Sequence, residues 1–250
     1  MAIKFIQLIT SSQRSHKTNV QLGAYMAFVA GAVNAGGFLA IARYTSHMSG
    51  IISAIGDDLA LNNIISVLGG ISLLLSFLFG AATTAIIVNW GHRKKIHSAF
   101  ALPLLVEAIL LLIFGLAGAN LNIYAPLTVP AIALLLCFVM GLQNAIVTKA
   151  SRAEIRTTHM TGIVTDIGIE LGKLIYWNKS VEANKQGLVQ VNRERLKTHL
   201  SIFGMFLMGG IIGAISFKRV GYISVLPLSV SLVLIASMQI YRDIKGFVSE

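Results

Sequence analysis

Two short segments of the sequence carry the same unusual set of polar side chains, a histidine with hydroxyl groups on either side. The residues are Thr45, His47 and Ser49 in the first segment and Thr157, His159 and Thr161 in the second. Each set precedes a short helical pattern, so the hydroxyls are placed to cap a helix. The start of a helix carries free N–H groups and partial positive charge, and Arg43 and Arg156 lie a few residues upstream. This combination suits a small anion, although the hydroxyls can also serve only as caps and the arginines can contact lipid phosphate.

Amide side chains interrupt two otherwise apolar stretches at equivalent places. Asn34 and Asn144 each occur in a G-x-x-N-A motif. An amide without a partner is costly in such a setting. Each asparagine therefore lines a polar path or binds substrate, or else hydrogen-bonds across helices or to the backbone of a broken helix. Gln143 has Val33 as its counterpart, so any role for this residue is asymmetric.

Three acids are candidates for proton coupling. Glu107 lies in the middle of a long apolar stretch, where a carboxyl group is a functional hypothesis by default; a neutral, hydrogen-bonded structural acid is the alternative. Asp58 and Glu170 occupy equivalent positions inside the two short helical patterns. Burial would favour their protonated forms, whereas a position on the wet side of an amphipathic segment would leave them ordinary.

The sequence contains no nucleophile motif, nucleotide-binding loop or metal-ligand cluster, so no catalytic residue, cofactor or metal is predicted. His-Met occurs twice, and these side chains suit Cu(I), but the predicted topology places the two pairs on opposite faces of the membrane. The chain is therefore predicted not to be an enzyme, and a membrane enzyme ranks third among the functions considered. The net charge of +10 is attributed to membrane topology, and no nucleic-acid partner is expected.

The composition is that of a membrane protein. Of the 250 residues, 55% are hydrophobic and only 12% are charged, against about 25% charged in a typical soluble domain. Six apolar stretches are long enough to cross about 30 Å of hydrocarbon. They cover approximately Leu22 to Ala42, Ile64 to Trp90, Phe100 to Ala119, Pro126 to Thr148, Leu200 to Phe217 and Tyr222 to Tyr241. The predicted fold is an all-α polytopic membrane protein with six transmembrane helices and two short re-entrant or half-helices, His47 to Leu61 and His159 to Trp177.

The short segments belong to an internal repeat. Residues 45–59 align without a gap with residues 157–171, and the G-x-x-N-A motifs align upstream. We divide the single membrane domain into a cytoplasmic leader (1–20), repeat 1 (21–120) and repeat 2 (121–245), which contains a basic cytoplasmic loop (178–198). Each repeat has three crossings and one partial crossing, so the second would be inverted relative to the first. Small residues recur every fourth position in the first and fourth helices, which predicts that these two helices pack together.

The distribution of basic residues selects the topology. If both termini are cytoplasmic and the short segments do not cross, all but three of the 20 Lys and Arg residues face the cytoplasm. The exceptions are Arg43, Lys218 and Arg219. Because cytoplasmic loops of membrane proteins are enriched in basic residues, the sequence favours this six-crossing arrangement.

The motifs G-x-x-N-A, T-S-H-M-S-G and R-T-T-H-M-T-G, in this order and spacing, resemble the YoaK family of bacterial integral membrane proteins, a domain of unknown function. The likeness covers about residues 23–241. It implies an inner-membrane protein of six or seven helices and supplies no substrate. The family's first helix often has an acid where this chain has Asn34, and asparagine often stands where this chain has Ile51, so a proton or cation role for that acid does not carry over.

The predicted function is a membrane transporter or channel for a small polar or anionic solute. The predicted location is the bacterial inner membrane, with multiple crossings and with both termini in the cytoplasm. The expected partners are the lipid bilayer and the solute, and a homo-oligomer is compatible with the sequence. The alternative is a non-transport membrane scaffold or sensor subunit that binds a cytoplasmic partner through residues 178–198.

Overall fold

The structure, a computed structural model, describes residues 15–96, 98–118, 125–176 and 189–248. Most of the predicted leader and residues 178–188 of the predicted cytoplasmic loop lie outside this part of the chain. Within the described ranges all regular secondary structure is helical. The prediction of an all-α fold is therefore confirmed.

Most helix ends lie within three residues of the predicted boundaries, but the first long helix begins six residues earlier, at His16, the fifth begins seven residues earlier, at Arg193, and the sixth ends seven residues later, at Val248. They are α2 (His16–Ile41), α3 (Met48–Ala60), α4 (Ile64–Arg93), α5 (Ala101–Gly118), α6 (Ala125–Ala150), α7 (Met160–Ile175), α8 (Arg193–Val220), the 3₁₀ turn η1 (Gly221–Ser224) and α9 (Val225–Val248). Local side chains fix several starts: Ser15 and Thr18 form a reciprocal capping box before α2, and Asn63 caps α4 by accepting from the Ser66 N–H. Asn192 caps α8 in the same way, through the Arg195 N–H.

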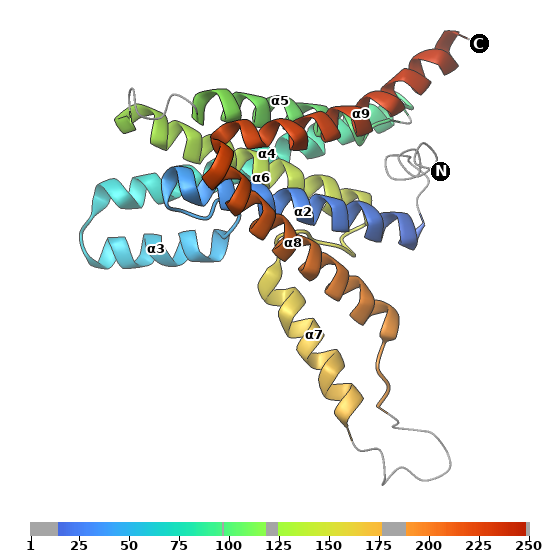
Figure 1. The fold of residues 1–250 in the computed structure, drawn as a ribbon, viewed down its shortest axis with the longest axis horizontal. Helices are drawn as coiled ribbons and strands as arrows, with labels where there is room; N and C mark the ends of the chain where they lie inside the picture. The colour runs from blue at the N-terminus through green and yellow to red at the C-terminus, as the bar shows by residue number, and fades with distance from the viewer. Residues whose placement is uncertain (1–14, 97, 119–124, 177–188, 249–250) are drawn as a thin grey trace.

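Five stretches are long and apolar enough to cross a membrane. They are His16–Ile41, Ile64–Arg93, Ala101–Gly118, Pro126–Ala150 and Arg193–Ser237. The last is 45 residues long and combines α8, η1 and part of α9, which the sequence analysis counted as two crossings. The chain reverses its direction at η1, between α8 and α9 (Figure 1). A multi-pass helical membrane protein is thus supported.

The six long helices form one bundle in which successive long helices run in opposite directions (Figure 1). The main pairs join the two predicted repeats: α2 packs against α8, α4 against α6, and α5 against α9. In the repeat alignment α2 corresponds to α6, and α4 corresponds to α8. The first two pairs are therefore the same contact made twice, with the partners exchanged.

Glycines allow the closest approaches within these pairs. A Cβ atom added to Gly31 in α2 would meet the Phe206 carbonyl oxygen in α8, and one added to Gly141 in α6 would meet the Phe77 carbonyl oxygen in α4. Gly209 and Gly80 make the reciprocal approaches. The stripes of small residues predict that α2 and α6 pack together, and these two helices are in contact. The central glycines of the stripes, however, lie against α8 and α4.

The outer surface of the bundle is apolar. On α4, for example, Ile65 is 85% exposed, Ile86 69% and Phe79 63%. A soluble domain rarely leaves so many large apolar side chains on one helix open to water. This surface fits the hydrocarbon of a lipid bilayer, which is the partner that the sequence predicts.

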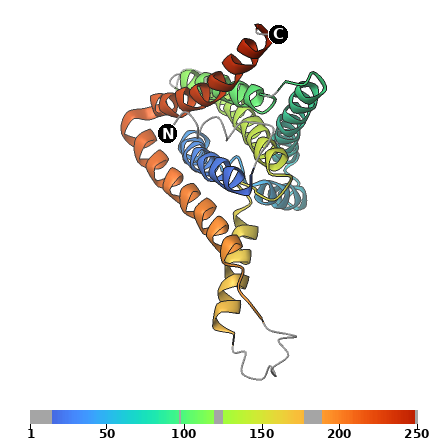
Figure 2. The same ribbon diagram turned by 90° about the vertical axis from the view of Figure 1, so that its right-hand side faces the viewer.

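The two short helices pack at the edge of the bundle. α3 lies against the first part of α4, and α7 forms a hairpin with α8 that projects from the other helices (Figures 1 and 2). No side chain of α3 is fully buried, and in α7 only Ile163 and Glu170 are. Each short helix is therefore held mainly by one neighbour.

Candidate functional site

The amides of the two G-x-x-N-A motifs hold the chain just before the short helices. The Asn34 Oδ1 accepts from the backbone N–H of Ser46 at 3.4 Å, and the Asn144 Oδ1 accepts from the Thr158 hydroxyl at 2.8 Å. Thr157 donates to the same oxygen at 3.4 Å. Ser46 and Thr158 are equivalent in the repeat alignment, so each asparagine oxygen accepts a bond from the same position, through the backbone N–H in the first half and through the side-chain hydroxyl in the second. Asn34 thus bonds to the backbone before its short helix, which is one of the predicted alternatives, whereas Asn144 bonds to side chains there.

Each histidine lies directly before the first residue of a short helix, with its ring over a glycine. A Cβ atom on Gly162 would lie 2.6 Å from His159 Cε1, and one on Gly50 would collide with the His47 ring. The glycine of H-M-[ST]-G is thus required for the position of the ring. The prediction that hydroxyls cap these helices is wrong: His47 and His159 occupy the N-cap positions, and neither helix has a side-chain cap. Ser49 and Thr161 are already inside the helices, so the first-turn N–H groups receive no bond from them.

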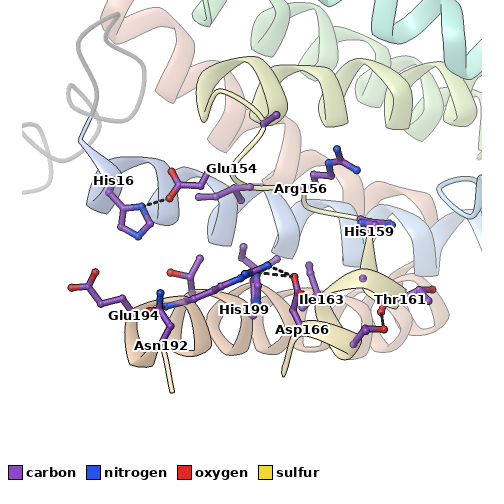
Figure 3. A pocket seen from close by; sticks show the side chains of 17 residues that line it. His16, Glu154, Arg156, His159, Thr161, Ile163, Asp166, Asn192, Glu194 and His199 are labelled. Carbon is purple, nitrogen blue, oxygen red and sulfur yellow. Dashed lines mark hydrogen bonds and ion pairs between the residues drawn. The ribbon is translucent and has the colours of Figure 1, made fainter. Parts of the chain in front are cut away.

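A cavity of about 800 Å³ opens beside the start of α7 (Figure 3). We call it the α7 pocket. Its lining combines α7, the start of α8, the start of α2 and the segment before α7. The polar and charged lining residues are His16, Glu154, Arg156, His159, Thr161, Thr165, Asp166, Asn192, Glu194, Arg195, Thr198 and His199.

Ion pairs organise part of the α7 pocket (Figure 3). The Asp166 carboxylate contacts Arg195 at 3.1 Å and His199 Nε2 at 3.7 Å, which joins α7 to α8. His16 and Glu154 pair at 2.6 Å at the other end. The buried Nδ1 of His199 has no hydrogen-bond partner within the described residues. The pocket therefore offers both charge signs and an unused polar atom to a small polar ligand.

A second cavity, about 250 Å³, occupies the matching place beside the start of α3. We call it the α3 pocket. Arg43, Tyr44, His47, Gly50, Ile51 and Ala54 line it, and their repeat counterparts Ile155, Arg156, His159, Gly162, Ile163 and Asp166 line the α7 pocket. Asp58 also lines the α3 pocket. The two halves thus place equivalent histidines at the two cavities, of which the α7 pocket is larger and more charged. Each cavity also has arginine in its lining, but Arg43 and Arg156 occupy neighbouring and not equivalent positions of the repeat.

A third cavity, about 480 Å³ and mostly apolar, lies between α2 and α8. Asn34 lines it, together with Tyr44 from the segment before α3 and Met160 from the start of α7. This cavity brings the approaches to both short helices together. Asn144 lines none of the three cavities.

Glu170 fastens α7 to α8. Its side chain is 2% exposed, its Oε1 pairs with Lys173 at 2.8 Å, and its Oε2 accepts from the Asn192 N–H at 2.7 Å. The hydrogen bond from Lys173, followed by the one from Asn192, holds the pKa of this carboxyl below its usual value. These bonds favour the charged form and a fastening role; proton coupling at Glu170 remains a prediction.

Glu107 and Gln143 lie in the core of the bundle, away from the three cavities. Both side chains are fully buried, and Gln143 donates to the Met26 carbonyl oxygen at 2.8 Å. Among the other predicted residues, Thr45 and Thr157 are buried, whereas Ser49 and Arg156 are exposed.

Several lining residues of the α7 pocket were not predicted from the sequence, namely His16, Glu154, Arg195 and His199. The basic residues before the fifth apolar stretch were predicted to form a cytoplasmic loop. The sequence does contain an acid, Asp166, in the second short segment and basic residues just before the next apolar stretch. Only the α7–α8 hairpin brings these opposite charges together. Within the described residues no group of three His, Cys, Asp or Glu side chains could hold a metal ion.

Comparison with known proteins identifies the family. Residues 22–238 match the model of a family described as a protein of unknown function, DUF1275. The chain is also similar to the UPF0700 transmembrane protein YoaK of Bacillus subtilis (strain 168), with 24% identity over 156 residues, which cover 62% of this chain and 68% of that protein. No solved structure matches the chain. The apolar helical bundle and the match across most of its length lead to one conclusion: the chain belongs to the YoaK (DUF1275) family of multi-pass transmembrane proteins.

Proposed function

We propose that the protein is a transporter or channel for a small polar or anionic solute. The observation that carries this proposal is the pair of equivalent cavities at the starts of the two short helices. Each cavity has a histidine over the first helical turn and an arginine in its lining. Free N–H groups in a first turn add partial positive charge, so each cavity can attract an anion or the negative end of a dipole.

The proposed arrangement is a pair of inverted repeats, each with three crossings and one short helix. Its support is the exchanged pairing of α2 with α8 and of α6 with α4, together with the opposite directions of α2 and α6 (Figure 1). In this proposal α8 and α9 cross separately, both termini are cytoplasmic and the membrane is the bacterial inner membrane. Transport proteins with inverted repeats bind their substrates where the two halves meet.

Rocking of one half against the other would expose the α3 pocket and the α7 pocket in turn. The mobile parts are the two hairpins, α3 with α4 and α7 with α8, because each short helix is held by one neighbour. The third cavity, which Asn34 lines between α2 and α8, lies between the approaches to both short helices and is a candidate for the connecting path.

The test is a flux screen with the purified full chain in proteoliposomes. Small anions and neutral polar solutes are offered one at a time, and Arg156→Gln and His159→Ala are compared with the wild type. Arg219→Gln is the matched control, because Arg219 is exposed and lines neither cavity.

We expect at least one solute to move, with a loss of tenfold or more in the two pocket variants and no change in the control. If every solute is excluded, or if the pocket variants and the control move it equally well, the transport proposal is wrong. Binding of a cytoplasmic protein in the absence of any flux would instead support a scaffold or sensor.

A further inference from the structure

A layer of polar side chains crosses the core of the bundle where four long helices meet. Its members are Tyr25 in α2, Glu107 in α5, Gln143 in α6, and Ser229 and Ser231 in α9. Hydrogen bonds tie the helices together at this level: Tyr25 with Ser231 at 2.5 Å, Ser229 to the Ala108 carbonyl at 2.6 Å, and Gln143 to the Met26 carbonyl at 2.8 Å. None of these five residues lines any of the three cavities.

Glu107 is the acidic member of this layer. Its side chain is completely buried, and neither carboxyl oxygen has a hydrogen-bond partner within the described structure. The Oε1 of Gln143 is also buried without a partner. Native proteins rarely leave such atoms unpaired, so each instance calls for an explanation, such as a bound species or a catalytic role.

No cation compensates the Glu107 carboxyl in the described part of the chain. From α2, the Tyr25 hydroxyl lies within electrostatic range. From α4, His92 packs edge-on against Phe100, and from η1, Tyr222 packs edge-on against Phe114. Phe100 and Phe114 are each seven residues from Glu107. At 1.5 Å per residue, the two ring contacts therefore lie about 10 Å before and after Glu107 along the helix axis. From α6 and α9 the layer contributes only the amide and hydroxyl groups.

A bare carboxylate without a partner is not stable in such surroundings, so the conformation described here holds Glu107 with its proton. The carboxyl can ionise only in a conformation that admits water or a cation to it. The proton affinity of Glu107 therefore differs between conformations, and by linkage the pH shifts their populations.

We infer that Glu107 is a proton-binding site that the protein loads and empties as it changes conformation. The proton comes from water on one side of the membrane, forms an O–H bond with the carboxylate, and returns to water when that bond breaks in another conformation. Tyr25 lies within electrostatic range of the site, and Gln143, Ser229 and Ser231 are the other polar side chains of the same layer. The inference rests on the proposed transport function, since it supplies the coupling ion for the same moving halves.

The first test observes the carboxyl directly. Infrared spectra of the full chain in lipid nanodiscs are recorded from mildly acidic to alkaline pH, for wild type, Glu107→Gln and Asp57→Asn. Glutamine has the shape of the protonated acid, so Glu107→Gln should fold, and Glu107→Asp provides a second variant that keeps the acid. Asp57 is an exposed acid on α3 and serves as the matched control.

We expect a protonated-carboxyl band that the wild type and Asp57→Asn lose as the pH rises. Glu107→Gln should lack this band, and Glu107→Asp should shift its midpoint. A band that Glu107→Gln removes but that does not change with pH would identify a permanently neutral structural acid and overturn the inference. A carboxyl that is already ionised at every pH and responds to sodium would also overturn it.

The second test separates this inference from the proposed transport function. Proteoliposomes that contain the protein are given an imposed pH gradient in the presence of a solute found in the flux screen. The accumulation of that solute inside the vesicles is then measured. The wild type and Asp57→Asn should accumulate solute, and Glu107→Gln should lose this accumulation by tenfold or more. If Glu107→Gln accumulates solute normally, the inference fails while transport stands. If no solute moves in the wild type but the infrared band titrates as expected, transport fails while the proton site stands.

Discussion

At the scale of single residues, the partner of a polar side chain decides its role. Asn34 and Asn144 both occur inside apolar helices, and both accept hydrogen bonds from the segment that leads into a short helix. His47 and His159 both lie over a glycine that leaves room for the ring. These contacts position the walls of the two pockets, so small changes at these residues should act on the short helices.

We predict that Asn144→Leu loosens the segment before α7. The buried Thr157 hydroxyl and the Thr158 hydroxyl would lose their acceptor, and an unpaired buried polar group costs about 1–3 kcal/mol. The thermal unfolding midpoint in detergent should fall, and hydrogen exchange at residues 155–159 should speed up. Asn89→Leu is the control, because Asn89 is exposed and its partner is Lys149. Unchanged exchange in Asn144→Leu would contradict the fastening role.

Gly162→Ala should displace the His159 ring without unfolding the protein. The new methyl group would lie 2.6 Å from Cε1, and the exposed ring can turn away. We expect shifted His159 ring signals in NMR spectra of histidine-labelled protein and little change in the unfolding midpoint. Gly168→Ala, on the same helix with open space around it, should leave the ring signals in place and stabilise α7 by about 0.5–1 kcal/mol. Equal ring shifts in both variants would refute the steric explanation.

At the scale of elements, the α7–α8 hairpin is held by polar contacts more than by apolar packing. Glu170 bonds to Lys173 and to the Asn192 N–H, and Asp166 pairs with Arg195. Only Ile163 and Glu170 of α7 are buried. A hairpin with this composition should respond to pH and salt through its ion pairs, whereas the glycine contacts between the long helices, which carry no charge, should not.

We predict that acid releases α7 from α8. Because the folded pKa of Glu170 is below its usual value, its stabilisation is complete above the unfolded pKa and is lost as the pH falls through the folded pKa. Hydrogen exchange of α7, corrected for the intrinsic rate, should therefore increase in acid. Glu170→Gln should show the fast exchange already at neutral pH and little further change, while Asp57→Asn should behave as the wild type does. A wild-type response to acid in Glu170→Gln would assign the effect to other groups.

At the scale of the whole molecule, helices of one predicted repeat pack against helices of the other. The first helix of each predicted repeat packs against the second long helix of the other, through glycines that bring the backbones into contact. α5 and α9 pack together on one side of this arrangement. The exchanged contacts make neither repeat a complete packing unit by itself.

Gly80→Ala should destabilise the bundle. Its Cβ would meet the Phe138 carbonyl oxygen and lie 3.0 Å from the Leu142 backbone N, and neither atom can move without shifting α6. Overpacking of this kind costs about 1–3 kcal/mol. Gly204→Ala, which has open space on α8, should be neutral or slightly stabilising. The unfolding midpoint in detergent compares the two variants, and equal midpoints would show that α4 and α6 can separate freely.

Labelling in whole cells tests the inverted arrangement. In a Cys137→Ala background, His47→Cys should react with an impermeant maleimide from outside, and His159→Cys only after permeabilisation; both native side chains are exposed. Lys94→Cys and Arg219→Cys are the controls for the inner and outer faces. If His47→Cys and His159→Cys react from the same side, the two halves are parallel and the proposed layout is wrong.

Much of the fold follows from local sequence properties. Apolar runs of sufficient length specify membrane helices because every backbone N–H and C=O must be satisfied inside the bilayer, and the short helices begin at the repeated H-M-[ST]-G motifs. The equivalence of the two histidines and of the two asparagines follows from the gapless repeat alignment. The hydrogen-bond partners of the two asparagines could not be deduced in the same way. Ser46 reaches Asn34, and Thr158 reaches Asn144, only because the chain turns back after each long helix.

The sequence by itself determined the class of protein, the positions of the helices and the duplication, because these depend on composition and on spacing along one segment. The tertiary structure decided which helices exchange partners, that the glycine stripes face α8 and α4, and that His16, Arg195 and His199 join His159 around one cavity. It also placed Glu107 among uncharged groups from three other helices. These features depend on contacts between residues far apart in the chain, and packing in three dimensions selects such contacts among many that the same helices could make.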